Sequence, residues 1–373
     1  MNKIVILTLI LILFSSCQLF LGAEHDTGPE GVLTSLWNDF NIIHAYIDIR
    51  MSNNREFTSW DDVLHNASRG YKKRLSDGMP LFDACGNMLR ELGDPHVGLY
   101  APGKSFYSTP TRDVLTELET ERKWFLFRDL NYNTREHYLS EEKVFDDRDI
   151  MFLYGLFKER YEKIGYVHIR GFSDSSDFGG VQDWVKQINI IIEYFIENDT
   201  DAVVVDVRNN DGGSTVNMEY IAARFAAEKK DYLKISTKNG PGRNDFSPPV
   251  TYTIQPDGTR YVNTIVLLTN KVSVSAAEWF ILAMREQPHV HHMGTATRGA
   301  LSARMARPMI NGWYYTISAD KVEDISGKCY EGVGIRPDNP EHIITGIWDD
   351  WEVNRTNRDR QLDKVLEWLV PLP

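Results

Sequence analysis

The residues best suited to chemistry in this sequence lie in the stretch 264–284, between a predicted strand and a predicted helix. The apolar run 265–268 is typical of a buried strand, and the residues from 276 to 285 predict a helix. Ser275 stands directly before that helix, whose first N–H groups point toward whatever the serine would attack. Ser275 and Glu278 also match a capping box, in which the serine only caps the helix. The local sequence does not separate capping from catalysis.

A second polar turn follows the apolar run 202–207. This turn, Asn210-Asp211-Gly212-Gly213, comes after a predicted buried strand, as Ser275 does. Ligands of parallel sheets bind at the carboxyl ends of the strands, so we expect both turns at one edge. Two adjacent glycines let backbone N–H groups approach a substrate closely, although an ordinary tight turn would also use them. The sequence lacks a GxGxxG or GK[ST] phosphate loop here.

One histidine stands out by its position in a rigid turn. A helix is expected to end at Gly93, and Pro95 prevents the helix from continuing, so His96 lies just beyond its end. Such a histidine is a candidate proton acceptor or an ordinary surface residue. The histidines within 289–292 lack a carboxylate or cysteine at ligand spacing and fit a strand, so we expect no metal or other cofactor.

The composition is that of a globular protein with a large core. The chain has 373 residues, of which 42% are hydrophobic and 25% are charged, which suggests two domains or one large domain with an appendage. The net charge of −12 argues against nucleic acid as a partner. Beyond the first residues, the only cysteines are Cys85 and Cys329, which form either a disulfide or two separate thiols.

The N-terminus has the pattern of a secretory signal peptide over residues 1–17. A basic start precedes the apolar run 4–14, which is too short to span a membrane. The run leads to Ser15-Ser16-Cys17, which resembles a bacterial lipobox, so we expect lipid on Cys17. Phe14 replaces the usual leucine and leaves cleavage by the ordinary signal peptidase open. Residues 18–30 predict a flexible tether. Together, these features predict an exported bacterial lipoprotein at the cell envelope, either at the outer membrane or in the periplasm.

The hydrophobic pattern divides the rest of the chain into four parts. Residues 31–100 predict a small helical domain of three helices, and residues 101–160 predict a connecting region with little structure. Strands and helices alternate over 161–347, which indicates an α/β core with a largely parallel sheet. The last part, 348–373, predicts a final amphipathic helix.

Five motifs in order resemble the tail-specific (C-terminal processing) serine peptidase family, which includes the tricorn core protease. They are Gly165-Tyr166-Val167-His168-Ile169, the run from Asp206 to Gly213, the run from Ser273 to Glu278, the run from Gly294 to Gly299 and the run from Tyr330 to Asp338. The resemblance covers about residues 164–338 and implies a crotonase-like β/α spiral for the core. It also implies a nucleophile at Ser275, with the N–H groups of Gly213 and Ala276 as oxyanion donors.

The sequence departs from most of the family at the catalytic base. The family's lysine position holds Ala300 here, and the nearest lysine beyond the serine, Lys321, lies outside the motif. The tricorn-like branch uses a histidine instead, which His96 resembles. That branch has a glutamate at the position of Glu331, which helps to hold the histidine through a serine. Because Pro95 precedes His96 here, we expect Glu331 or Asp94 to contact the histidine directly.

The resemblance therefore implies a serine peptidase that acts on peptides or proteins. The alternative is a binding module of the same fold that has lost its chemistry and holds a hydrophobic ligand or a peptide. A histidine base with an ordinary pKa near 6.5 would make the rate fall on acidification through that range. If His96 approaches Glu331, Cys85 lies at the far end of a helix from Cys329, and the two thiols stay unpaired.

Overall fold

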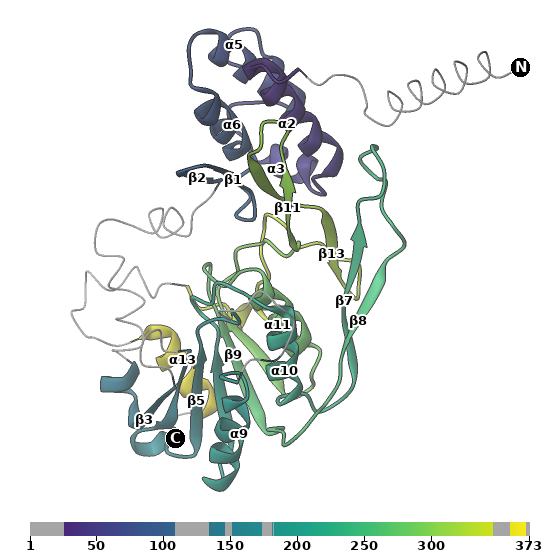
Figure 1. Ribbon diagram of the computed structural model, residues 1–373. Coiled ribbons are helices and arrows are strands. Elements are labelled where there is room, and N and C mark those ends of the chain that lie inside the picture. The colour runs from purple at the N-terminus through teal and green to yellow at the C-terminus, as the bar shows by residue number, and fades with distance from the viewer. Residues whose placement is uncertain are drawn as a thin grey trace, which may run out of the picture.

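A six-stranded mixed sheet forms the centre of the larger lobe in the computed structural model (Figure 1). The structure describes residues 26–108, 134–145, 151–173, 181, 183–345 and 359–370. The strand order is β10-β9-β6-β5-β4-β3, in which β5, β6, β9 and β10 are parallel and β3 and β4 are antiparallel additions. The strands are β3 (Leu139–Phe145), β4 (Phe152–Phe157), β5 (Ile164–Ile169), β6 (Ala202–Asp206), β9 (Thr264–Thr269) and β10 (Val290–Gly294).

Helices cover both faces of this sheet, which explains why its central strands are apolar along their whole length. On one face lie α9 (Gln187–Glu197), α10 (Thr215–Ala223) and α11 (Ala276–Arg285), packed on Val203, Val205 and Leu267. On the other face, α13 (Arg360–Leu369) packs on Val204 and Val266. The expected α/β core and C-terminal helix are confirmed.

The N-terminal lobe combines helices with a four-stranded antiparallel sheet of order β11-β12-β1-β2. Its helices are α2 (Pro29–Ile43), α3 (Ile47–Ser52), α4 (Trp60–His65), α5 (Tyr71–Ser76) and α6 (Leu81–Arg90). The strands are β1 (Gly98–Ala101), β2 (Lys104–Tyr107), β11 (Arg304–Pro308) and β12 (Tyr314–Ser318). Leu33, Phe40, Leu99, Tyr315 and Ile317 share one buried cluster, so strands from both ends of the sequence complete this lobe.

A third sheet of order β13-β7-β8 projects beside the two lobes (Figure 1). Its strands are β7 (Lys230–Thr237), β8 (Val250–Ile254) and β13 (Asp320–Asp324). Short 3₁₀ helices, η1 (Glu159–Tyr161) and η2 (Pro340–His342), complete the described elements.

The structure corrects the predicted domain plan in two places. The helical part has five described helices rather than three. Asn66 accepts the N–H groups of Ser68 and Arg69 and separates α4 from α5, and the extended backbone at His44 separates α2 from α3. The expected connecting region, 101–160, supplies β2, β3 and β4, and the last two extend the core sheet.

Two other expectations concern the cysteines and the N-terminus. Cys85 and Cys329 are free thiols, as the proposed site required. The predicted signal peptide with Cys17 lies outside the described residues, as does most of the tether. Within the described residues, helices with the length and apolarity to cross a membrane are absent.

Candidate active site

Ser275 occupies a strained turn between β9 and α11. Its backbone has φ of 62° and ψ of −124°, whereas N-cap residues ordinarily have extended backbone. A non-glycine residue in this region costs about 1–3 kcal/mol and persists only when the surroundings impose it, most often at functional sites. Ser275 is half-buried and begins α11, so the first N–H groups of that helix face the space beside its side chain.

Glu278 holds this turn in place. The carboxylate is fully buried and accepts the N–H of Ser275 at 3.1 Å and that of Ala300 at 2.9 Å. It also accepts the N–H of Gly299 at 2.7 Å and the hydroxyl of Thr297 at 2.5 Å. Burial raises the pKa of Glu278, and these hydrogen bonds oppose the rise. The predicted capping residue therefore ties the serine turn to the loop 297–300, a function that the capping pattern alone did not predict.

Gly212 lies against the serine turn, as expected from the pairing of β6 with β9, and Gly213 lies against the backbone of Phe172 and Ser173. A Cβ on Gly212 would come within 2.8 Å of the Cβ of Ser275 and within 2.8 Å of the carbonyl oxygen of Val274. The positive φ values of the two glycines, 90° and 131°, also favour glycine. The N–H groups of Gly213 and Ala276 donate no backbone hydrogen bond within the described residues, so both are available to an oxyanion.

His96 lies in the turn between α6 and β1, and its backbone is fixed from both sides. Its N–H donates to Asp94 Oδ1 at 2.8 Å, and its carbonyl accepts the hydroxyl of Thr316 at 2.7 Å. The imidazole is buried, and its Nδ1 has no hydrogen-bond partner within the described residues. Burial lowers the pKa of His96 to about 4, with Asp94 opposing and nearby arginines assisting. The ring is therefore neutral at pH 7 and can accept a proton.

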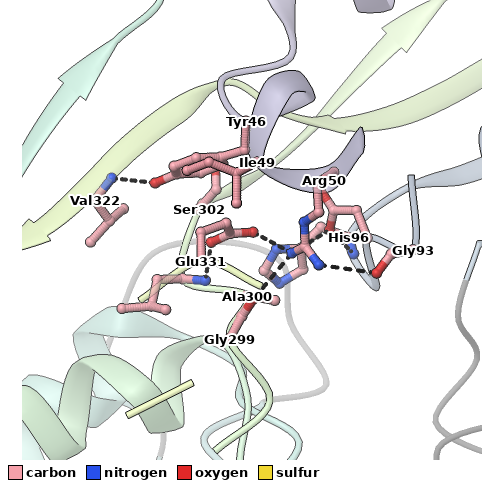
Figure 2. Close-up of polar contacts among 12 residues, drawn as sticks. Tyr46, Ile49, Arg50, Gly93, His96, Gly299, Ala300, Ser302, Val322 and Glu331 are labelled. Atoms are coloured by element: carbon pink, nitrogen blue, oxygen red, sulfur yellow. Dashed lines mark hydrogen bonds and ion pairs between the residues drawn. The ribbon is translucent and has the colours of Figure 1, made fainter. Parts of the chain in front are cut away.

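Glu331 has different partners from the one predicted. Figure 2 shows the guanidinium of Arg50 between the Glu331 carboxylate and the Gly93 carbonyl, with the His96 ring beside it. The Arg50 Nη2 atom lies 2.5 Å from Glu331 Oε1, and the N–H of Leu301 donates to Glu331 Oε2 at 2.9 Å. Both carboxylate oxygens therefore bind other groups than the imidazole of His96. Burial raises the pKa of Glu331 to about 7, against the effect of Arg50.

Asp94, the alternative partner for the histidine ring, contacts the backbone of His96 instead. Its Oδ2 accepts from His44 Nε2 at 2.9 Å, and Arg50 lies 3.8 Å from its Oδ1. Burial opposes ionisation of Asp94, but Arg50 and His44 hold its pKa below the usual range. The prediction that Glu331 or Asp94 would bind the imidazole directly therefore differs from the structure, because Arg50 draws both carboxylates toward itself.

Arg50 joins the lobes at this point. Besides the carboxylates, it donates to the carbonyls of Gly93 and Gly299, both at 3.0 Å. Gly93 belongs to the turn that carries His96, and Gly299 belongs to the loop beside Ser275. The N–H of Ser275 donates to the carbonyl of Ala300 in that loop at 3.2 Å. The role of Arg50 was not predicted, because in the sequence it resembles any basic residue of an amphipathic helix.

A lysine base is not found at the family position. Ala300 is fully buried. Its N–H donates to the carboxylate of Glu278, and its carbonyl accepts the N–H of Ser275. Lys321 lies on β13 and pairs with Glu323 at 2.7 Å. In the part of the chain that the structure describes, clusters of side chains that could hold a metal ion are absent.

Comparison with known proteins decides the family. The model of peptidase family S41 matches residues 163–340, which contain Ser275, Glu278, both glycines and Glu331. The chain contains a peptidase family S41 domain. The predicted resemblance to the tail-specific peptidase family is thereby confirmed over residues 163–340.

Relatives of the S41 domain support this assignment. The carboxy-terminal processing protease CtpB of Bacillus subtilis is 26% identical over 216 residues, 56% of this chain and 42% of CtpB. The match therefore spans less than half of that relative. A candidate peptidase of Parabacteroides merdae has a solved structure with a TM-score of 0.70 and 25% identity, over 92% of this chain and 98% of that one. Mature CPAF in complex with lactacystin shares the fold, with a TM-score of 0.62 and 13% identity over 91% and 97% of the two chains.

Proposed function

We propose that this chain is a serine peptidase that hydrolyses peptide bonds of peptides or proteins. The observation that carries the proposal is the strained turn of Ser275, which packs on Gly212 and begins α11. The N–H groups of Gly213 and Ala276 donate no backbone hydrogen bond within the described residues. A turn of this kind presents a serine hydroxyl to a substrate carbonyl, whereas capping needs no such strain. Membership in the S41 family supports the same function.

In the proposed reaction, the hydroxyl oxygen of Ser275 attacks the scissile carbonyl while the neutral imidazole of His96 takes its proton. The N–H groups of Gly213 and Ala276 stabilise the oxyanion, and losing one such donor typically costs about 3 kcal/mol of activation free energy. The tetrahedral intermediate collapses as the imidazole gives the proton to the leaving amine, and water then hydrolyses the acyl enzyme by the same steps.

In this mechanism, Glu331 acts through Arg50 rather than on the imidazole. Arg50 connects the carboxylate to the carbonyls on either side of the site, at Gly93 and Gly299. Glu331 would therefore position the two loops that carry the reacting groups. This arrangement departs from the direct carboxylate–histidine contact that the sequence predicted.

A fluorophosphonate probe tests the proposal, because it labels serines that are activated for attack. Wild-type protein should be labelled at Ser275 and should cleave peptides, whereas Ser275→Ala should do neither and should remain folded. Ser59→Ala is the matched control, since Ser59 caps α4 by accepting the N–H of Asp62 at 3.1 Å. That variant should lose about 1 kcal/mol of stability and keep its labelling.

The competing function is binding without catalysis by the same fold. The specific observation in its favour is that Nδ1 of His96 has no hydrogen-bond partner among the described residues, since a histidine base is ordinarily oriented by an acceptor at that atom. A folded wild-type protein that neither reacts with the probe nor cleaves any peptide would favour the binding module.

We further propose that the chain acts at the bacterial cell envelope, held by lipid on Cys17. The lipobox-like sequence and the tether after it support this location. Mass spectrometry of the mature N-terminus, together with membrane fractionation, tests it.

A further inference from the structure

The sheet of the N-terminal lobe has one apolar face and one face that holds tyrosines. Leu99, Tyr315 and Ile317 point into the helical cluster. Residues on the opposite face are fixed by the register, in which Gly98 pairs with Thr316 and Tyr107, and Tyr100 pairs with Tyr314. In antiparallel sheets, directly paired residues lie on the same face. Arg304 pairs with Ser318, two residues from Thr316, and lies on the same face. The outer face therefore holds Gly98, Tyr100, Tyr107, Tyr314, Thr316 and Arg304, which we call the tyrosine platform.

The platform begins at the proposed catalytic histidine. Thr316 donates to the carbonyl of His96, and Gly98 is two residues beyond that histidine. A Cβ on Gly98 would meet the hydroxyl of Tyr100 at 2.8 Å, so the tyrosine side chain reaches back toward the histidine turn. The face is buried at Thr316 and opens outward, to 44% exposure at Tyr107 and 48% at Tyr314.

The rings of the platform are ordered against one another. Tyr100 and Tyr314 stack with centroids 4.5 Å apart and an interplanar angle of 7°, and Tyr107 meets Tyr100 edge-on at 5.6 Å. Stacked rings of this kind have fixed orientations and give a partner a large contact area at low entropic cost. Exposed aromatic side chains that lie together in this way are typical of binding surfaces.

A cation completes the platform. The guanidinium of Arg304 lies 5.8 Å from the ring centroid of Tyr100 and 5.9 Å from that of Tyr107, and it donates to the Tyr100 hydroxyl. These interactions are with tyrosines and leave Arg304 without an ion-pair partner among the described residues. In a chain of net charge −12, a cation without a carboxylate partner beside the site is complementary to an acidic ligand. Its charge is among those that lower the pKa of His96, which places it within electrostatic reach of the histidine.

We propose that the tyrosine platform binds the substrate peptide beyond the scissile bond, through an acidic side chain on Arg304 and a neighbouring apolar or proline side chain on the tyrosine rings. This inference rests on the proposed peptidase function and assigns its substrate class, an extended peptide with an internal Asp or Glu. Arg304 and Tyr314 are then specificity residues, which act through substrate binding.

Direct binding to the Ser275→Ala protein tests the platform without any need for turnover. The probes are two acetylated and amidated peptides of the same Leu- and Pro-containing sequence, which differ only in Glu or Gln. The Glu peptide should bind about two- to fivefold more tightly, the range expected of an exposed ion pair, and high salt should reduce the preference. Arg304→Gln should abolish the preference, and Tyr314→Ala should weaken both peptides about two- to tenfold.

Arg307→Gln is the matched control, because Arg307 pairs with Tyr315 and lies on the opposite face of the same strand. It removes the same charge and should leave the preference unchanged. Equal binding of the two peptides, or equal effects of the two arginine variants, would overturn the proposal.

The failure of this proposal is distinguishable from failure of the peptidase function. If wild-type protein cleaves peptides and Tyr314→Ala has unchanged KM and kcat, the platform is wrong and the function stands. If the protein is inert to the fluorophosphonate but binds the Glu peptide through Arg304, the platform stands and the peptidase function fails.

Discussion

Replacing Gly212 by alanine tests whether the glycine turn positions Ser275. The new Cβ would lie 2.8 Å from both the Cβ of Ser275 and the carbonyl oxygen of Val274, whereas ordinary contact begins at 3.4 Å. The serine turn must therefore shift by about 0.6 Å. Since a displacement of about 1 Å can cost 10²-fold in rate, kcat/KM should fall about tenfold or more.

The same substitution also imposes strain, because φ at Gly212 is 90°. Gly78→Ala separates the two effects, since Gly78 has φ of 100° but a Cβ added there would have no neighbouring atom within 4 Å. Both variants should lose about 1–2 kcal/mol of stability from the left-handed backbone. Only Gly212→Ala should also lose activity.

Three measurements decide this prediction: urea unfolding, the rate of fluorophosphonate labelling and kcat/KM on a cleaved peptide. Gly78→Ala should label at the wild-type rate despite its lower stability. If Gly212→Ala is folded and labels as fast as Gly78→Ala, the contact between Gly212 and Ser275 does not set the position of the nucleophile, and the reasoning fails.

Other predictions concern the base, the buried cation and the anchor. Because burial holds His96 neutral, protonation of this base should lower kcat/KM only near pH 4; a midpoint near neutral pH would show that another group, such as Glu331 with its pKa of about 7, controls the rate. Arg50→Met should lower the free energy of unfolding by about 3–5 kcal/mol, since it leaves the carboxylates of Asp94 and Glu331 buried without their cation. A loss below about 1 kcal/mol in urea unfolding would contradict this role. Cys17→Ala should move the protein from the membrane fraction to the soluble fraction, and a wild-type protein that is already soluble would refute the anchor.

The elements with a clear local hydrophobic pattern were predicted correctly from the sequence. The runs 202–206 and 264–269 are apolar throughout because helices cover both faces of the sheet, and both form the predicted strands. The helix after Ser275 was also predicted correctly. The strain at Ser275 was not predicted, since a positive φ at a serine depends on the tertiary contacts that impose it.

Long-range charge pairing was the part of the site that the sequence could not give. Arg50 and Glu331 are 281 residues apart, and local periodicity does not indicate which carboxylate a helical arginine will reach. The resemblance to the family implied that Glu331 contacts His96, whereas in the structure Glu331 contacts Arg50. The capping pattern predicts that Glu278 contacts Ser275. It does not predict the hydrogen bonds of Glu278 with Gly299 and Ala300, which lie 21 and 22 residues later.

Other misses have local explanations. The strands β7 and β13 mix charged and apolar residues, since they pair in a sheet that stands apart from the main core, and their alternation is weak. The break after α4 was readable, because Asn66 and Gly70 bracket a short polar stretch of the kind that ends helices.

The pairing of β1 with β12 has a consequence for biosynthesis. The histidine turn is folded only when residues 314–318 are added to a sheet that begins at residue 98, and its arginine cluster also needs Glu331. A chain that emerges N-terminus first, from the ribosome or during the proposed export, presents Ser275 well before those later residues. The N-terminal lobe cannot close around His96 until residues 314–318 have joined the sheet, so the nucleophile and its proton acceptor meet late in folding. For a proposed peptidase, this order of assembly would protect the growing chain and its neighbours from premature cleavage.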